Sequence, residues 1–241
     1  MKRSLTLTFT FLFIFNLFNV SIAQNGIGTF RVGSFYDGTA WSDVFNKKLK
    51  EADRYALPDL KGSPYEYPDF TFGKLFYKNN LEGEFPLRYD VYVDEIQIMN
   101  GEEIGAILKT KDIHVNINGV NYFLLGYVLD EVYKEGYFIE KIKGDNVSLL
   151  IKKRKFYMEG QPAQNSFIRA VAPKFTDNEI YFVWFEKDKE PIYLPNKKNK
   201  FLALFPENKK TEIEAFLKEN KIKFNNIEDL QKFFTFYNQL P

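Results

Sequence analysis

The sequence predicts an α+β protein that is mainly antiparallel β, as a curved sheet, a sandwich or an open barrel, with a small C-terminal helical unit. Three observations support this prediction. Between residues 70 and 196, short runs alternate apolar with polar side chains, and turn residues separate the runs. From residue 197 onward, the apolar spacing changes to that of amphipathic helices. The sequence contains no glycine-rich strand-to-helix motif of a nucleotide-binding α/β fold.

Residues 1–23 have the pattern of a cleaved secretory signal. A basic start precedes the apolar run 5–18, and small residues at Ser21 and Ala23 predict a cut before Gln24. No later apolar stretch reaches the ~20 residues of a membrane-spanning helix, so we expect no transmembrane span after cleavage. No cysteine follows the signal, which excludes a lipoprotein anchor. We therefore expect an exported protein, either periplasmic or extracellular.

Composition narrows the available chemistry. The chain has 241 residues, 45% of them hydrophobic, which is sufficient for a packed core. It has no cysteine and one histidine, which excludes a disulfide scaffold, a cysteine nucleophile and thiolate or polyhistidine metal sites. The formal net charge of +1 becomes −1 when Lys2 and Arg3 leave with the signal. We expect no nucleic-acid partner, no metal and no cofactor.

The mature chain begins with its least regular part. Residues 24–69 contain many glycines and prolines, which predict turns and an irregular connection around a short helix over 42–55. An antiparallel β body then occupies 70–196. Its first element is a strand over 70–78, because the side-chain pattern there repeats every two residues. A turn region over 79–86 follows.

The strand expected over 87–99 has the densest polar cluster of the sequence. Its apolar face switches parity at Asp94, which predicts a bulge, a bend or a turn there. Arg88, Asp90, Tyr92 and Asp94 share one parity and hence one face. We interpret this face as a binding surface for a ligand or a partner. The alternative is a solvated face with a cross-strand Arg–Asp pair.

The strongest local signal is a hairpin over 113–125. Asn118 and Gly119 separate two alternating runs, which is typical of a two-residue type I′ turn. This pairing predicts three core-facing pairs, which are Ile117 with Val120, Val115 with Tyr122, and Ile113 with Leu124. His114 and Phe123 then lie on the more polar face.

The rest of the body is predicted from shorter runs. The expected strands are 136–143, 147–157, 166–171, 179–186 and 191–194. The basic run Lys152–Lys155 ends the second of these. We interpret this run as a solubilising strand edge, and the alternative is contact with an anionic surface or a phosphorylated glycolipid.

Residues 197–241 form the predicted helical unit. A polar, lysine-rich connection at Lys197–Lys200 leads into it. Asn208 is expected to cap a helix that runs to about Asn220, and Asn226 a second helix whose apolar stripe packs on the body.

Catalytic residues are not evident in this sequence. Asp90 and Asp94 would lie roughly 13 Å apart on a strand at ~3.3 Å per residue. This distance exceeds the roughly 5–9.5 Å between the carboxylates of a glycosidase. His114 has no nucleophile motif beside it and is expected to be a half-exposed strand residue. We therefore assign no catalytic residue.

Several landmarks carry a family resemblance. They are Gly62–Tyr65, Phe70, Gly73–Leu75, Leu87–Tyr92 with Asp94 and Glu95, Phe216–Lys218, Lys221–Ile222, Asp229–Leu230 and Tyr237–Asn238. Together these residues, over roughly 60–240, resemble a group of uncharacterised exported proteins of Bacteroidetes-type bacteria. The resemblance implies an exported, β-rich protein with a helical tail, and no established activity. Asp90 stands where asparagine is common in that group.

We therefore predict a non-catalytic protein of the cell envelope that binds an envelope protein or a ligand through its sheet. Two alternatives remain open. The first is a carrier of an apolar ligand such as a lipid in a half-barrel, which a large cavity lined by Phe and Tyr would favour. The second is a carboxylate-dependent glycan hydrolase, which two carboxylates converging in one cleft would favour.

Overall fold

The computed structural model describes residues 45–48, 59–163, 165, 167, 169–185 and 189–241, the first of these ranges by its backbone only. All of them belong to the unit Val32–Pro241. The predicted signal over 1–23 lies outside the described residues.

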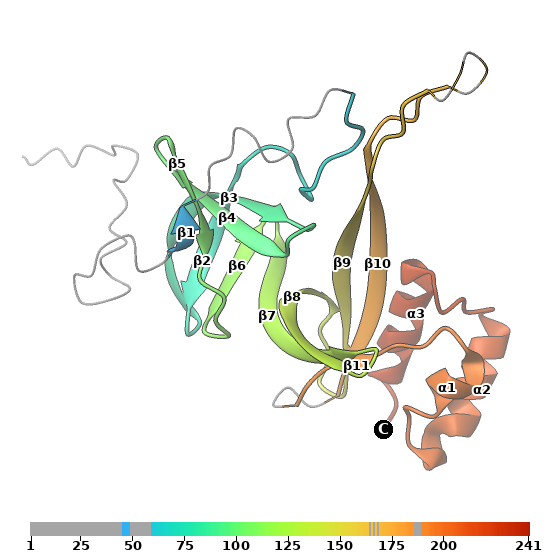
Figure 1. The fold of residues 1–241 in the computed structure, drawn as a ribbon. Coiled ribbons are helices and arrows are strands. Elements are labelled where there is room, and N and C mark those ends of the chain that lie inside the picture. Colours follow the sequence, from blue (N-terminus) through green and yellow to red (C-terminus); the bar gives the residue numbers. More distant parts are fainter. Residues whose placement is uncertain (1–44, 49–58, 164, 166, 168, 186–188) are drawn as a thin grey trace, which may run out of the picture. The chain divides into compact units, whose positions relative to one another are not determined.

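The strands form one antiparallel sheet, and most strands pair with their neighbours in the chain (Figure 1). The order across the sheet is β1-β5-β4-β3-β2-β6-β7-β8-β9-β10-β11. The strands are β1 (Phe45–Lys48), β2 (Thr71–Tyr77), β3 (Asn80–Asp90), β4 (Glu95–Asn100), β5 (Glu103–Ile107), β6 (Ile113–Ile117), β7 (Val120–Leu129), β8 (Val132–Ile142), β9 (Ser148–Met158), β10 (Lys174–Trp184) and β11 (Ile192–Tyr193). In the part of the chain that is described, β1 and β11 are the two ends of an open sheet, which confirms the predicted fold class.

The hairpin between β6 and β7 follows the prediction. Asn118 and Gly119 have φ angles of 54° and 80°, as a type I′ turn requires. Ile117 pairs with Val120, and the apolar side chains of both strands face the core. Glycine matters here because it adopts a positive φ without steric cost.

Two further hairpins have the same kind of turn without glycine. Lys78 and Asn79 (φ 46° and 67°) join β2 to β3, and Asp130 and Glu131 (53° and 64°) join β7 to β8. The turn region predicted over 79–86 is therefore wrong. β3 starts directly after the first of these turns and pairs with β2 along that stretch.

The chain reverses where the apolar parity switches. β3 ends at Asp90, residues 91–94 form a turn, and β4 starts at Glu95 and pairs back onto β3. The predicted single strand over 87–99 is thus a hairpin. Asp94 has a left-handed φ of 58°, which a continuous strand does not allow.

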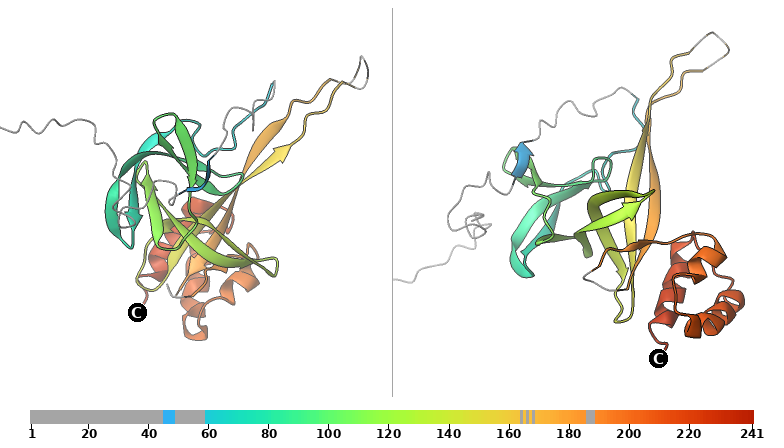
Figure 2. Two further views of the ribbon diagram at one scale, coloured as in Figure 1. Left: turned by 60° about the vertical axis from the view of Figure 1, so that its left-hand side comes forward. Right: turned by 60° about the horizontal axis from the view of Figure 1, so that its bottom comes forward.

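Apolar side chains of the described residues form three clusters. The first joins residues from β2, β4 and β7, such as Leu75, Ile96 and Tyr122, because the sheet curves around them (Figure 2). The second fills the space between β9, β10 and the C-terminal helices, and includes Leu149. The third lies on the opposite face of β9 and β10 and includes Leu150. β9 contributes to all three clusters, because Leu149 and Ile151 share one face of the strand and Leu150 points to the other.

The C-terminal unit consists of α1 (Lys198–Leu202), a 3₁₀ helix (Glu207–Lys209), α2 (Lys210–Glu219) and α3 (Ile227–Tyr237). Asn226 caps α3 as predicted, because its side chain accepts a hydrogen bond of 2.9 Å from the backbone N–H of Asp229. Asn208 does not cap α2, because it lies inside the 3₁₀ helix that precedes it. The connection expected at Lys197–Lys200 instead starts α1, whose Phe201 is buried.

Asn238 fastens the end of α3 to the loop between β8 and β9. Its side-chain oxygen accepts hydrogen bonds from the backbone N–H groups of Asn146 (3.2 Å) and Val147 (3.0 Å). Its side-chain nitrogen donates to the carbonyls of Val147 and Phe234, both at 2.9 Å. The helical unit thus has a polar attachment to the sheet in addition to its apolar core.

Two other predictions fail for local reasons. Within the helix expected over 42–55, Phe45–Lys48 is strand β1, which pairs with β5, and the remaining residues lie outside the described part. The strand expected over 166–171 is not formed by its described residues. Only Val171 pairs there, as an isolated bridge to Gln161.

Candidate functional site

Arg88 is buried under the segment that leads into β2, so it is not part of an exposed face. Its Nε and Nη2 donate to Oε1 of Gln97 (3.0 and 2.7 Å), and its Nη1 donates to the carbonyl of Pro68 (2.9 Å). The rings of Tyr65 and Phe70 lie on its guanidinium, with centroids at 3.6 and 4.1 Å. Burial lowers the pKa of Arg88 to about 10. Arg88 therefore fastens the preceding segment to the sheet.

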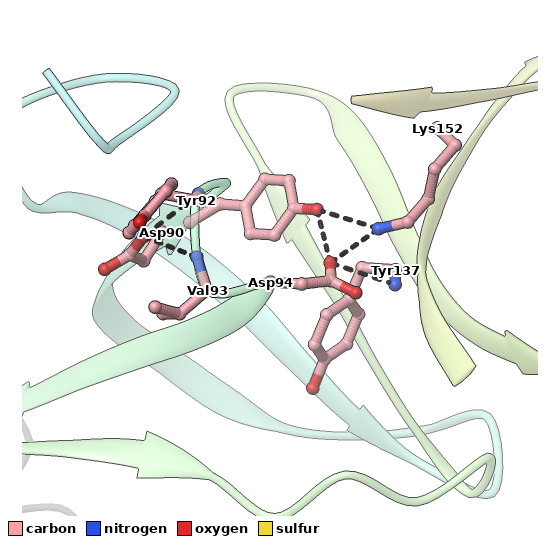
Figure 3. A network of polar contacts seen from close by, with 7 residues as sticks. Asp90, Tyr92, Val93, Asp94, Tyr137 and Lys152 are labelled. Carbon is pink, nitrogen blue, oxygen red and sulfur yellow. Dashed lines mark hydrogen bonds and ion pairs between the residues drawn. The ribbon is translucent and has the colours of Figure 1, made fainter. Parts of the chain in front are cut away.

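Asp90 shapes the turn between β3 and β4. It is fully buried, and its Oδ1 accepts hydrogen bonds from the backbone N–H groups of Tyr92 (3.1 Å) and Val93 (3.2 Å) (Figure 3). Tyr92 is half-exposed, and its ring packs edge-on against Phe175. The predicted shared face is therefore wrong, because the strand ends at Asp90 and places Tyr92 and Asp94 in a turn.

Asp94 is the centre of a buried polar network (Figure 3). Its Oδ1 accepts hydrogen bonds from the Tyr89 hydroxyl (2.6 Å), from Lys152 Nζ (2.7 Å) and from the backbone N–H of Tyr137 (3.3 Å). Burial lowers the pKa of Lys152, although the charge of Asp94 acts in the opposite direction. Burial and the same carboxylate raise the pKa of Tyr89 well above its usual value. The network joins the β3–β4 turn to β8 and β9.

This network fills the space that is available to it. Gly136 lies beside it, and a Cβ atom there would be 2.4 Å from Asp94 Oδ2 and 2.8 Å from Lys152 Cε. Lys152 is 3% exposed. We therefore interpret the Asp94 network as a set of contacts that stabilises the fold and not as a ligand-binding site.

A pocket of about 380 Å³ lies on the face of β9 that carries Ile151 and Lys153. Its walls come from the segment before β2, the β6–β7 turn, β8, β9, β10 and the start of α3. Most of its charged side chains are acidic. They are Glu66, Glu140 and Glu179, against the cations Lys141 and Lys153.

Lys153 lies between two of these carboxylates. Its Nζ is 2.5 Å from Oε1 of Glu66 and 3.2 Å from Oε1 of Glu179. Burial opposes the charge of Lys153, but the hydrogen bonds and charges of Glu66 and Glu179 outweigh burial and raise its pKa. Lys153 Nζ thus joins two acidic side chains from different parts of the chain.

The rest of the pocket adds an aromatic ring and an amide. Tyr67 lines it with 44% of its surface exposed, and Tyr122 lines it as a buried residue. Asn121 lies at the start of β7, and its Oδ1 accepts a hydrogen bond of 2.6 Å from the side-chain nitrogen of Asn116. The pocket thus offers hydrogen-bonding groups around one accessible ring. We call it the Lys153 pocket.

Sequence reasoning did not find the Lys153 pocket. Glu66, Lys153 and Glu179 lie in three separate parts of the chain, and only strand pairing and the path of the segment before β2 bring them together. The one sequence signal was the basic run Lys152–Lys155. Alternation along a strand already separates Lys152 from Lys153, but it does not name their partners.

The basic run is partly as expected. β8 pairs with β9 only as far as Ile151, so the run begins where β9 loses its neighbour on that side. It is not simply solvated, because each of its lysines has an acidic partner. These pairs are Lys152 with Asp94, Lys153 with Glu66 and Glu179, and Lys155 with Asp177.

His114 lies on the predicted face of β6. It is partly exposed and stacks between Phe76 (centroids 4.6 Å apart) and Phe123 (5.1 Å). Burial lowers its pKa. The ring stacks between strand neighbours and does not line the Lys153 pocket.

The described residues contain no cluster of three or more His, Cys, Asp or Glu side chains that could hold a metal ion. Among these residues, no helix has both the length and the apolar character needed to cross a bilayer.

The fold and the pocket define an open antiparallel β protein with a pocket on one face of its sheet. No family model matches the chain. Neither a curated protein nor a solved structure matches it. The resemblance to exported Bacteroidetes-type proteins stays a prediction.

Proposed function

We propose that the protein is an exported, non-catalytic binding module of the cell envelope, and that its ligand is a short glycan held in the Lys153 pocket. The observation that supports this proposal is the pocket itself. It opens on the sheet face, has about 380 Å³ of space, and surrounds it with charged and amide side chains. Specific small-molecule sites combine such a concavity with a few placed polar groups.

The chemistry of the lining favours a polyhydroxylated ligand. Carboxylates accept hydrogen bonds from hydroxyl groups, and Lys153 donates to hydroxyl oxygens once a ligand shares its partners. Tyr67 presents an exposed ring on which the apolar face of a sugar can pack. The lining also includes aliphatic side chains, which are Val120, Ile139, Ile151 and Ile227, but no phenylalanine, and such a mixed lining suits a ligand with both hydroxyl groups and apolar faces.

Nuclear magnetic resonance spectra of the exported protein test this proposal. Maltotriose, cellotriose and chitotriose are suitable neutral probes, and we expect one of them to shift the amide signals of residues 119–122 and 151–153. Replacing Tyr67 by Ala should weaken binding about tenfold, or about 1.4 kcal/mol. The control is Phe72→Ala, which removes an exposed ring that does not line the pocket. If no probe shifts these signals, the glycan assignment fails.

Export itself needs a separate experiment. Residues 1–23 are proposed to be removed during secretion, so the N-terminal residue of protein recovered from the periplasm or the medium should be Gln24. An intact Met1 would contradict the signal assignment.

One observation also favours glycan hydrolysis as a second candidate function. Glu66 and Glu179 converge on one nitrogen inside one pocket. Retaining glycosidases hold two carboxyl groups about 5–5.5 Å apart, and two groups that contact the same nitrogen meet this need for proximity. Lys153 Nζ lies between the two carboxyl groups, where the scissile bond of a substrate would have to lie, which makes binding the better-supported function.

Product analysis separates the two functions. The oligosaccharides that bind are incubated with the protein, and their reducing ends are measured. Binding without new reducing ends supports the non-catalytic module. Hydrolysis that disappears in both Glu66→Gln and Glu179→Gln, but persists in Asp177→Asn, would establish the hydrolase instead.

A further inference from the structure

β9 and β10 continue as a two-stranded ribbon beyond their neighbours in the sheet (Figure 1, Figure 2). β8 pairs with β9 only up to Ile151, whereas β9 and β10 remain paired as far as Met158 and Lys174. Gln161 and Val171 extend the ribbon, with two backbone hydrogen bonds of 2.8 Å. We call the described residues within 154–178 the arm.

The base of the arm is braced. Lys61 bridges to Lys174, and its backbone exchanges hydrogen bonds of 2.9 Å with Pro173 and Phe175. The rings of Tyr157 and Phe175 pack with centroids 5.3 Å apart. The base can therefore hold the outer part of the arm away from the rest of the sheet.

The outer arm exposes large apolar side chains. Phe167 is 95% exposed, and Met158 and Val171 are each about half-exposed, as is Phe156 on the sheet side of the base. Single exposed apolar residues are ordinary on protein surfaces, but a group of them on one projecting ribbon indicates an interaction site.

The charges of the arm are mostly positive. Between Glu159 and Asp177 the sequence contains no carboxylate, while Arg169 falls near the tip and Lys174 at the braced base. Asp177, on the sheet side of the base, is already paired with Lys155 at 2.7 Å. The tip thus combines the apolar Phe167 with the cationic Arg169 on a chain that is otherwise close to neutral.

We propose that the arm is a membrane-surface anchor. Its tip places Phe167 in the headgroup region of a bilayer that contains anionic lipids, and Arg169 lies beside lipid phosphates. Interfacial anchors combine these two attractions, since apolar groups enter the boundary with the acyl chains and basic groups are drawn to the negative surface.

A lipid surface fits the arm better than a protein partner does. Stable protein interfaces bury about 800 Å² on each partner, which needs a broad surface and not the end of a ribbon. A fluid bilayer can surround a single projecting side chain. Because few groups take part, the attachment is reversible and weakens when salt screens the charges. This role is independent of the Lys153 pocket.

Co-sedimentation of the exported protein with lipid vesicles tests the proposal. We expect binding to vesicles with about 30% phosphatidylglycerol in phosphatidylcholine, little binding to pure phosphatidylcholine, and a loss when salt rises from about 0.1 to 0.5 M. Phe167→Ala and Arg169→Gln should each weaken binding at least about threefold, and together about tenfold or more. Since both residues are exposed, the melting temperatures of the variants should match that of the wild type.

The matched control is Phe72→Ala, which removes a 67% exposed ring from β2, away from the arm. It should bind vesicles as the wild type does. Equal losses in Phe72→Ala and Phe167→Ala, or a wild type that does not bind anionic vesicles, would overturn the proposal. Binding to native membranes but not to lipid vesicles would also overturn it, in favour of a protein partner.

Discussion

Lys152 and Lys153 are adjacent in the sequence, and each pairs with carboxylates on a different face of β9. Lys152 lies in the closed Asp94 network and is 3% exposed. Lys153 lines an open pocket and has two acidic partners. Burial therefore dominates the pKa of Lys152 and lowers it, whereas the partners dominate that of Lys153 and raise it.

The comparison separates a structural ion pair from a candidate binding site. A buried pair without free space stabilises one arrangement of the chain, and the loss of one partner leaves an uncompensated charge. A lysine beside a pocket can exchange its partners with a ligand at lower cost, since water already reaches it. Identical side chains on one strand thus take different roles because of what surrounds them.

The largest expected effect comes from breaking the closed pair. Asp94→Asn keeps a residue that tolerates the left-handed φ of 58° but removes the charge that Lys152 faces. We expect a loss of about 3–5 kcal/mol in the free energy of unfolding, measured with urea. Asp177→Asn breaks the pair with Lys155 on its water-exposed side, since the Asp177 side chain is 79% exposed, and should cost less than about 1 kcal/mol. Equal losses in the two variants would contradict the proposed contrast.

A second test fills the space beside the same network. Gly136→Ala places a Cβ 2.4 Å from Asp94 Oδ2, and the surrounding atoms are fixed by the ion pair. We expect a loss of about 1–3 kcal/mol in unfolding free energy. In the control Gly126→Ala, the new atom meets the hydroxyl end of Tyr133, which is half-exposed and can turn into solvent. The control should therefore lose clearly less.

The parts of the fold that the sequence predicted are those set by local chemistry. Asn118 and Gly119 defined a turn, and the parity switch at Asp94 located the reversal of the chain. The turn at Asp130 and Glu131 was missed because neither residue is glycine, and pairing of the long strands holds their positive φ angles.

The candidate site depended on contacts that no local pattern encodes. Alternation predicted a shared face for Arg88, Asp90 and Asp94, but β3 ends at Asp90 and the following turn directs Asp94 to Lys152 instead. The Lys153 pocket requires Glu66 and Glu179 to contact the same lysine, Lys153 of β9. That meeting follows from the register of β9 with β10 and from the course of the preceding segment, and both are tertiary properties.

A third prediction concerns the pH dependence of the two lysines. The pKa of Lys153 is raised, so its contribution to stability is complete below the unfolded value of about 10.5 and is lost as the pH rises through the folded value. The pKa of Lys152 is lowered, so stability increases as the pH rises from its folded value towards about 10.5.

Side-chain nitrogen signals of the lysines measure both values. Lys152 should lose its proton at a lower pH than Lys153. Glu66→Gln should lower the pKa of Lys153 and reduce stability near neutral pH by about 1 kcal/mol, because the pair is only partly shielded from water. The same variant should leave the titration of Lys152 unchanged. The opposite order of the two lysines would refute the contrast between the two faces of β9.

The smallest expected effect belongs to His114. Unlike the two lysines, it has aromatic stacking partners and no acidic partner among the described contacts. Burial lowers its pKa, so the unfolded chain binds the proton more readily, and stability decreases as the pH falls below about 6.5. His114→Phe keeps a ring between Phe76 and Phe123 and should remove this part of the acid sensitivity. The difference should be less than about 1 kcal/mol, because the imidazole remains partly in water. Urea unfolding at pH 7 and pH 5 measures it, and an acid sensitivity that persists unchanged in the variant would assign the effect to the carboxylates instead.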